Sequence, residues 1–334
     1  MSSIIVLKFA LREVTVYFGL IILIPGLIGG ILNIIIFTTL KTFRQTTCAF
    51  YLTFAAFVGI GQMMTALFIR ILSDGFSVDP RGILWFCKIY TFAGNWFYAV
   101  WLTSICLATI DQLLSMSTYR RFSHLRFAQR FIIIACIGWF IHEIPLLVYW
   151  NVSAGTCKVT NPNYSTYFSH FTLPVLYSCL PIGIMSTFSL LAFYRARTLA
   201  SRRLNIVRLS RDRQLTAMLL VHVVYTVIVL IPFTTFNIYS LNTITTDPEQ
   251  QAVHALIFSI TILIEYSMFS VTFYIYYCVS KRFRRQLIHV IRIIIILRWE
   301  QWTHKLNNNQ VLPYPGEAIS RRDKSVSVEM ISVF

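Results

Sequence analysis

Two acidic residues, Glu143 and Glu265, lie within long apolar stretches of the chain, where an ionisable side chain is energetically expensive and often functional. Glu265 precedes Thr272 by seven residues and Tyr276 by eleven, so a helix would place all three on one face. There the Glu265 carboxylate could bind a basic group of a ligand, or it could make a structural hydrogen bond or carry a proton. Glu143, which follows His142, is interpreted as a packing residue.

A second set of candidates lies between Cys87 and Gln112, a stretch long enough for one membrane crossing. At 3.6 residues per turn, a single stripe carries Gly94, Tyr98, Trp101, Ile105, Ala108 and Gln112. Gly94, Asn95, Tyr98 and Trp101 could line a ligand pocket, although aromatic residues on such a helix could equally form core. The seven histidines are scattered at spacings that suit no metal site, so we expect no enzyme activity, no metal and no other cofactor.

The composition places these residues in a membrane protein. Of the 334 residues, 56% are hydrophobic and only 13% are charged, against about 25% in a typical soluble domain. The mean hydropathy is +0.65. Apolar runs predict helices at 15–38, 48–72, 85–116, 131–150, 173–194, 214–238 and 254–279. We therefore predict an all-α membrane protein, a bundle of seven transmembrane helices with an amphipathic eighth helix.

The net charge of +16 reflects Lys and Arg gathered in alternate loops, which indicates an inside-loop bias rather than nucleic-acid binding. This pattern predicts a multi-pass protein of the plasma membrane with its N-terminus outside. Its parts are an extracellular segment 1–14, the bundle 15–279, a helix 280–299 on the inner leaflet and a disordered cytoplasmic tail 300–334. An eighth span is the alternative for 280–299. The last three residues, Ser332 to Phe334, resemble a ligand of PDZ proteins.

Of the seven cysteines, Cys87 and Cys157 fall on the predicted extracellular side, where disulfides persist. A disulfide between them would hold the loop after the fourth span across the mouth of the bundle. The alternative is two free thiols. The same loop carries two N-glycosylation sequons, at Asn151 and Asn163, and Asn163 is favoured because Asn151 lies close to the membrane.

Residues 15–285 resemble the rhodopsin-like (class A) G-protein-coupled receptors, and within that family the invertebrate peptide-type or orphan receptors. The resemblance rests on an ordered set of positions: Asn33, Cys87, Asp111 with Gln112, Trp139, Pro181, Pro232, the run Thr272–Tyr276, and Phe283. It implies a ligand site facing outward and a switch facing inward. The switch would involve Asp111, Gln112, Asp212, Pro232 and Tyr276.

The chain departs from the family pattern at several of these positions. The second-helix aspartate is Gly59, the motif arginine is Gln112, and the sixth-helix tryptophan is Leu230. A neutral Gln112 cannot form the charged fork of an arginine, so a lock to Asp212 would be a hydrogen bond to a single charge. The alternative for Asp212 is a solvated side chain. Where amine receptors of the family carry an acid, this chain has Gly94, which disfavours a small biogenic amine.

We therefore expect a cell-surface receptor that binds an extracellular ligand, a peptide rather than an amine, and activates a heterotrimeric G protein through basic cytosolic loops. Asp247 and Glu249, in a loop without bases, would suit a basic peptide. The alternatives are a chemosensory receptor for a small molecule, a transporter and a channel subunit. A transporter would show internal repeats, and a channel a polar pore-lining stripe, and we see neither in the sequence.

Overall fold

A computed structural model describes residues 2–39, 46–76, 78–117, 121, 123–153, 155–201, 206–243 and 247–292, with side chains at all of these except 2, 199–201, 206–213, 241 and 242. The chain divides into two compact units, Met1–Arg284 and Arg285–Phe334. The first unit carries the helical bundle. In the second, residues 285–292 are helical, while residues 293–299 of the predicted amphipathic helix and the whole tail 300–334 lie outside the described residues, so the amphipathic eighth helix stays a prediction.

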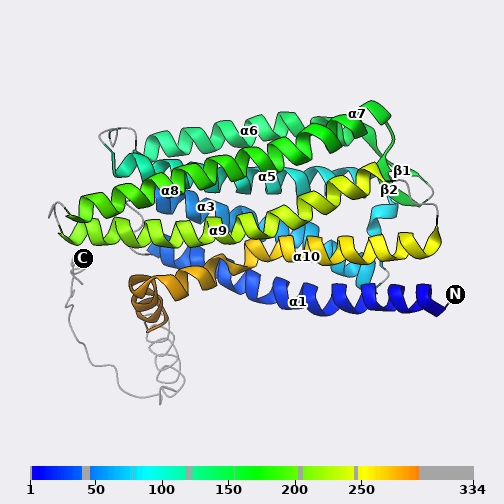
Figure 1. Cartoon of the computed structure of the whole chain (residues 1–334), viewed down its shortest axis with the longest axis horizontal. Helices are drawn as coiled ribbons and strands as arrows, with labels where there is room; N and C mark the ends of the chain where they lie inside the picture. Colours follow the sequence, from blue (N-terminus) through cyan, green and yellow to red (C-terminus); the bar gives the residue numbers. More distant parts are fainter. Residues whose placement is uncertain are drawn as a thin grey trace, which may run out of the picture. The chain divides into compact units, whose positions relative to one another are not determined.

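Seven helical segments of the described chain are long and apolar enough to cross a membrane (Figure 1). Five of these segments are single helices: α1 (Ser2–Thr39), α5 (Leu84–Ser115), α6 (Leu125–Tyr149), α9 (Ile206–Asn242) and α10 (Pro248–Val279). The second segment consists of α3 (Thr47–Gln62), η1 (Met63–Leu67), α4 (Phe68–Arg70) and η2 (Ile71–Gly75). The fifth segment consists of α7 (Pro162–Tyr167), η5 (Phe168–Cys179) and α8 (Leu180–Ser201). The prediction of an all-α bundle with seven membrane-spanning helices is confirmed, as expected for a multi-pass membrane protein.

Several helices begin earlier than the hydropathy of the sequence indicates. The first was predicted from residue 15 and begins at Ser2, and the fifth was predicted from 173 and begins at Pro162. Asn161 explains the second difference, because its side chain accepts a hydrogen bond from the backbone of Tyr164 and caps a helix with proline in its first turn. Hydropathy locates the apolar part of a helix, whereas caps determine its ends.

Packing places α5 at the centre of the bundle, where it contacts α3, α6, α8 and α9, while α1 runs along α10 (Figure 1). Small residues allow close helix approach. A Cβ added at Gly26 would lie 2.5 Å from the sulfur of Met63 and 2.9 Å from the Cβ of Ser270. A Cβ at Gly138 on α6 would meet nothing within 4 Å. Gly26 is therefore required for the contact of α1 with its neighbours.

A short antiparallel hairpin, β1 (Trp150–Ser153) and β2 (Thr156–Val159), follows α6. Its turn includes Gly155 at a φ of 74°, a conformation that favours glycine. Cys157 on β2 forms a disulfide with Cys87 at the start of α5, the pair expected from the sequence. The hairpin and the beginning of α1 lie at the same end of the bundle (Figure 1), which we call the disulfide end. The opposite end, where α5 finishes after Gln112, is called the Gln112 end.

Candidate functional site

A cavity of about 520 Å³ lies at the disulfide end of the bundle. Its walls come from α3, η1, α5, η5, α9 and α10, and residues of the hairpin and of η3 (Pro80–Gly82) complete its lining. A volume of this size is typical of small-molecule sites in proteins, which range over roughly 300–1,000 Å³. The disulfide fixes the hairpin to α5 beside the cavity, because Cys157 itself is a lining residue.

Four of the five predicted ligand-binding residues line this cavity: Gly94, Asn95, Tyr98 and Glu265. The structure does not bring Trp101 to it. Trp101 lies about one turn further along α5, is only 2% exposed, and packs edge-on against Phe269 with ring centroids 4.7 Å apart. Its indole also occupies the space beside Gly59, where an added Cβ would lie 3.4 Å from the indole nitrogen. A glycine opposite a tryptophan makes this a packing position.

Glu265 is the most unusual group in the lining. It is 2% exposed, its Oε1 atom has no hydrogen-bond partner among the described residues, and the ion pairs of the described side chains do not include it. The hydroxyl of Tyr98 is directed at Glu265 and interacts with it, although the pair does not meet the strict geometry of a hydrogen bond. A buried polar group without a partner costs free energy, and a buried charge costs more.

Three further lining residues share this property. The hydroxyl of Tyr98, the amide oxygen of Gln62 and the indole N–H of Trp150 are buried and lack a hydrogen-bond partner among the described residues. They come from α5, α3 and β1. Four polar groups on separate elements, Glu265 included, therefore surround one cavity without being satisfied by one another.

The rest of the lining is largely aromatic. Its rings are those of Tyr90, Tyr98, Trp150, Phe168, Tyr177, Phe233, Phe258 and Tyr266. Tyr98 and Tyr177 are in contact, with centroids 5.1 Å apart. An aromatic wall around an acidic group favours a ligand with an apolar body and a polar or charged end.

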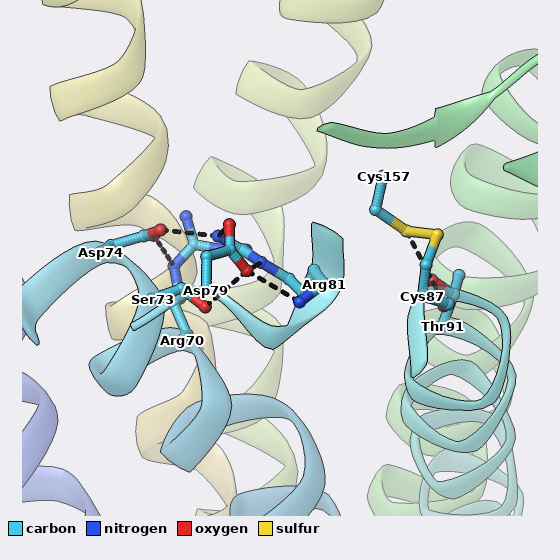
Figure 2. Close-up of polar contacts among 8 residues, drawn as sticks. All are labelled: Arg70, Ser73, Asp74, Asp79, Arg81, Cys87, Thr91 and Cys157. Carbon is cyan, nitrogen blue, oxygen red and sulfur yellow. Dashed lines mark hydrogen bonds and ion pairs between the residues drawn. A yellow bond between two sulfur atoms is a disulfide. The ribbon is translucent and has the colours of Figure 1, made fainter. Parts of the chain in front are cut away.

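An ion-pair cluster stands beside the cavity at the disulfide end (Figure 2). The Arg81 guanidinium donates to Asp79 from Nε at 2.8 Å and from Nη2 at 3.0 Å, and from Nη2 to Asp74 at 3.0 Å. The hydrogen bond from Arg81 lowers the pKa of Asp79, against the opposing effect of burial. Ser73 also donates to Asp79, and Arg70 lies 3.5 Å from Asp74. This cluster orders the connection between η2 and α5.

Sequence reasoning missed this cluster. Arg70 and Asp74 are spaced as an i, i+4 pair, and Asp79 with Pro80 begins a capped turn, so local signals were present. What the sequence did not show is that one guanidinium bridges the two aspartates.

Glu143 lies outside the cavity lining and is fully buried. It accepts a hydrogen bond from the hydroxyl of Tyr177 at 2.7 Å, and its neighbour His142 lies 2.9 Å away through Nδ1. These contacts tie α6 to η5, as a packing residue would. Because Tyr177 lines the cavity, Glu143 also fixes one of the cavity walls.

Two of the predicted switch residues, Asp111 and Gln112, lie at the Gln112 end, and a third, Tyr276, belongs to a separate cluster in mid-bundle. Gln112 donates to Thr216 on α9 at 2.9 Å, and both are 2% exposed. The partner predicted from the sequence was Asp212, one turn earlier, whose side chain lies outside the described part of the chain. Asp111 instead accepts a hydrogen bond from Ser123 at 2.8 Å.

The second cluster surrounds His222, a fully buried residue of α9 that sequence reasoning did not single out. Its Nδ1 lies 3.3 Å from the hydroxyl of Tyr276, and its Nε2 lies 3.3 Å from that of Thr272. A neutral imidazole carries one N–H, so one hydroxyl accepts and the other donates. Both partners are on α10, and Pro232 lies further along α9 toward the cavity. The cluster joins α9 to α10 in mid-bundle.

The two sequons differ in their surroundings. Asn163 is exposed in the first turn of α7. Asn151 is partly buried on β1, and its side-chain nitrogen donates to Thr160 at 3.1 Å. Asn163 is the more accessible acceptor for a glycan.

Searches of known proteins add no family to this geometry. Neither protein-family models nor curated protein sequences produced a match. Across the described residues, no group of three or more His, Cys, Asp and Glu side chains is placed to hold a metal ion.

Proposed function

We propose that the chain is a plasma-membrane receptor with its N-terminus outside. In this proposal it binds an extracellular ligand in the cavity at the disulfide end and activates a heterotrimeric G protein at the Gln112 end. The observation that carries the proposal is the cavity itself, with four unsatisfied buried polar groups at one end of a seven-helix bundle. The resemblance to rhodopsin-like receptors supports the direction of signalling.

The orientation rests on chemistry at the two ends. A disulfide between Cys87 and Cys157 suits an oxidising exterior, and the same end carries the exposed sequon at Asn163. The basic residues of the sequence gather in the loops of the other end, as in cytosolic loops. In intact cells, removal of a glycan from wild type but not from Asn163→Gln would support this orientation. A tag at the N-terminus that antibodies reach only after permeabilisation would refute it.

We propose that α9 transmits the effect of ligand binding from the cavity to the Gln112 end. This helix contributes Phe233 and Asn237 to the cavity, contacts α10 through His222, and holds Gln112 through Thr216. Pro232 interrupts its hydrogen bonding between cavity and His222, and prolines are common positions of helix bending. A ligand that moves the cavity end of α9 would therefore bias the contact of Thr216 with Gln112.

A second candidate is a chemosensory receptor for a small molecule. It is favoured by the volume of the cavity and by the hairpin that contributes to its lining, which leave less room for a peptide than an open cleft would. The two candidates share the same signalling mechanism and differ in the size of the ligand.

Receptor-expressing cells with a promiscuous G protein, screened against peptide and small-molecule libraries, test both candidates. A response that is absent from mock cells and lost when Cys157 is replaced by alanine supports the receptor. Gln112→Arg, in parallel, tests whether an arginine strengthens coupling. A ligand-evoked conductance or substrate uptake in cells lacking G proteins would overturn the proposal in favour of a channel or transporter.

A further inference from the structure

We infer that the ligand of this cavity is a small organic cation with an aromatic or apolar body, held through its charged nitrogen by Glu265 of α10. The inference rests on the proposed function for the use of the cavity as a ligand site. It goes further by naming the chemical class of the ligand, and it replaces the expectation of a peptide.

The charge of the lining supports a cation. Its ionisable acids and bases are Asp79, Arg81 and Glu265. Asp79 and Arg81 neutralise each other through a two-point ion pair. Arg70 acts on Glu265 from outside the lining, but its ion pair is with Asp74. Glu265 is therefore the acid of the described lining that has no ion-pair partner, and a positive group would complete the charge balance.

An anionic ligand has no comparable partner. Arg81 already donates to both Asp74 and Asp79, and Arg70 lies beside Asp74 with its guanidinium 5.2 Å from the ring of Phe258. An anion would have to compete with two carboxylates for Arg81 while approaching the unpaired Glu265.

The rings near Glu265 suit an organic cation rather than a bare ion. Tyr98 and Tyr266 both lie close enough to interact electrostatically with Glu265, and both line the cavity. Aromatic faces attract ammonium groups and also bury apolar surface. On α5, Gly94 leaves space in the cavity, where an added Cβ would meet Ala66 only at 3.9 Å.

The remaining unsatisfied groups indicate a second polar feature in the ligand. Among the described residues, the indole N–H of Trp150 on the hairpin has no acceptor and the amide oxygen of Gln62 on α3 has no donor. A molecule with a basic nitrogen and one hydroxyl or carbonyl oxygen would satisfy groups on several walls at once. In the sequence, Gly94 disfavours an amine because this position of the third span carries no acid. The structure supplies the acid from α10 instead.

The test uses the full chain purified into lipid nanodiscs and matched pairs of probes. Phenethylamine is compared with 2-phenylethanol, tryptamine with tryptophol, and phenylacetate serves as the anion. The readouts are Kd by thermophoresis and the shift in unfolding temperature. We expect each amine to bind about ten- to a hundredfold more tightly than its alcohol, as a charge-assisted hydrogen bond would give.

The variant Glu265→Gln keeps the shape of the side chain and removes the charge, and it should abolish the preference for the amine. The control Asp111→Asn neutralises another buried acid, one at the Gln112 end and outside the cavity lining, and should retain the preference. Equal binding of amine and alcohol, preference for phenylacetate, an amine preference that survives Glu265→Gln, or no binding by either amine at millimolar concentration would each overturn the inference.

The readout does not require a G protein, so the two proposals can fail separately. Selective amine binding without any G-protein response would refute the proposed signalling while sustaining the inference. Activation by a neutral ligand or a peptide, unchanged in Glu265→Gln, would sustain the signalling and refute the inference.

Discussion

Replacement of Thr216 by valine should loosen the Gln112 end of the bundle. Valine keeps the branched shape and removes the hydroxyl that accepts a hydrogen bond from Gln112 at 2.9 Å and lies 3.9 Å from the sulfur of Met116. Both Thr216 and Gln112 are buried, so water cannot readily replace the lost contact. The hydrogen bond joins α5 to α9, and the substitution therefore weakens a contact between helices.

The magnitude follows from hydrogen bonds between membrane helices, which contribute about 0.6 kcal/mol on average and up to about 1.7 kcal/mol. A loss of about 1 kcal/mol changes a conformational equilibrium roughly fivefold. The unfolding temperature should fall by about 2–4 °C if the bundle behaves as a domain of moderate size. If the contact favours the inactive state, basal activity should rise by up to about fivefold.

The assay combines thermal unfolding of the purified protein with basal second-messenger output in cells. The matched control is Thr226→Val on the same helix, because the buried hydroxyl of Thr226 donates to the backbone of His222 within α9. That substitution removes a hydroxyl of the same kind without breaking a contact between helices. If the two variants have equal unfolding temperatures and equal basal activity, the hydrogen bond of Thr216 does not hold α9 to α5.

Three further outcomes follow from the structure. Gly26→Ala should destabilise the bundle by about 1–3 kcal/mol because its neighbours must move, whereas Gly138→Ala should be nearly neutral in the same unfolding assay. Cys87→Ala and Cys157→Ala should reduce surface expression equally, and the double variant should be no worse than either; unequal single variants would contradict the shared bond. The pKa of Asp79 is lower in the folded protein than in the unfolded chain, where an aspartate has a pKa of about 3.9. Asp79 therefore stabilises the fold at pH values above about 3.9, and this stabilisation is lost as the pH falls through the pKa of Asp79 in the folded protein. Asp79→Asn should remove that part of the acid-induced fall in unfolding temperature, and an unchanged acid profile would show that the ion pair contributes nothing.

Hydropathy was sufficient to predict the fold, because lipid leaves few ways to satisfy a backbone. Long apolar runs predicted seven helices, and the placement of Cys87 and Cys157 predicted their disulfide. Gly94 and Tyr98, which the sequence offered as possible pocket residues, line the cavity. In these cases one local or periodic property determines the outcome.

The contacts between helices could not be predicted in the same way. Trp101 shares a stripe with Tyr98, yet it packs beside Gly59 because a large ring fills the room that a glycine on α3 leaves. Gln112 meets Thr216 because of the axial register of α5 against α9, which one sequence does not specify. The clusters of His222 and Arg81 likewise depend on residues brought together from separate elements.

The proposed mechanism links these clusters along one helix. Glu265 on α10 and Phe233 on α9 line the cavity, while His222 joins the same two helices further along. A cation bound at Glu265 would change the charge at the disulfide end of α10 and could alter its packing against α9. A movement of α9 would then weaken or strengthen the hydrogen bond between Gln112 and Thr216 at the other end of the bundle.

The most direct test of this account is nucleotide exchange on a purified heterotrimeric G protein, measured with the receptor in nanodiscs. We predict that phenethylamine or tryptamine accelerates exchange with the wild-type receptor, but not with Glu265→Gln. Exchange with the wild-type receptor equal to that of empty nanodiscs with every probe would contradict the account, and so would an acceleration that is unchanged in Glu265→Gln.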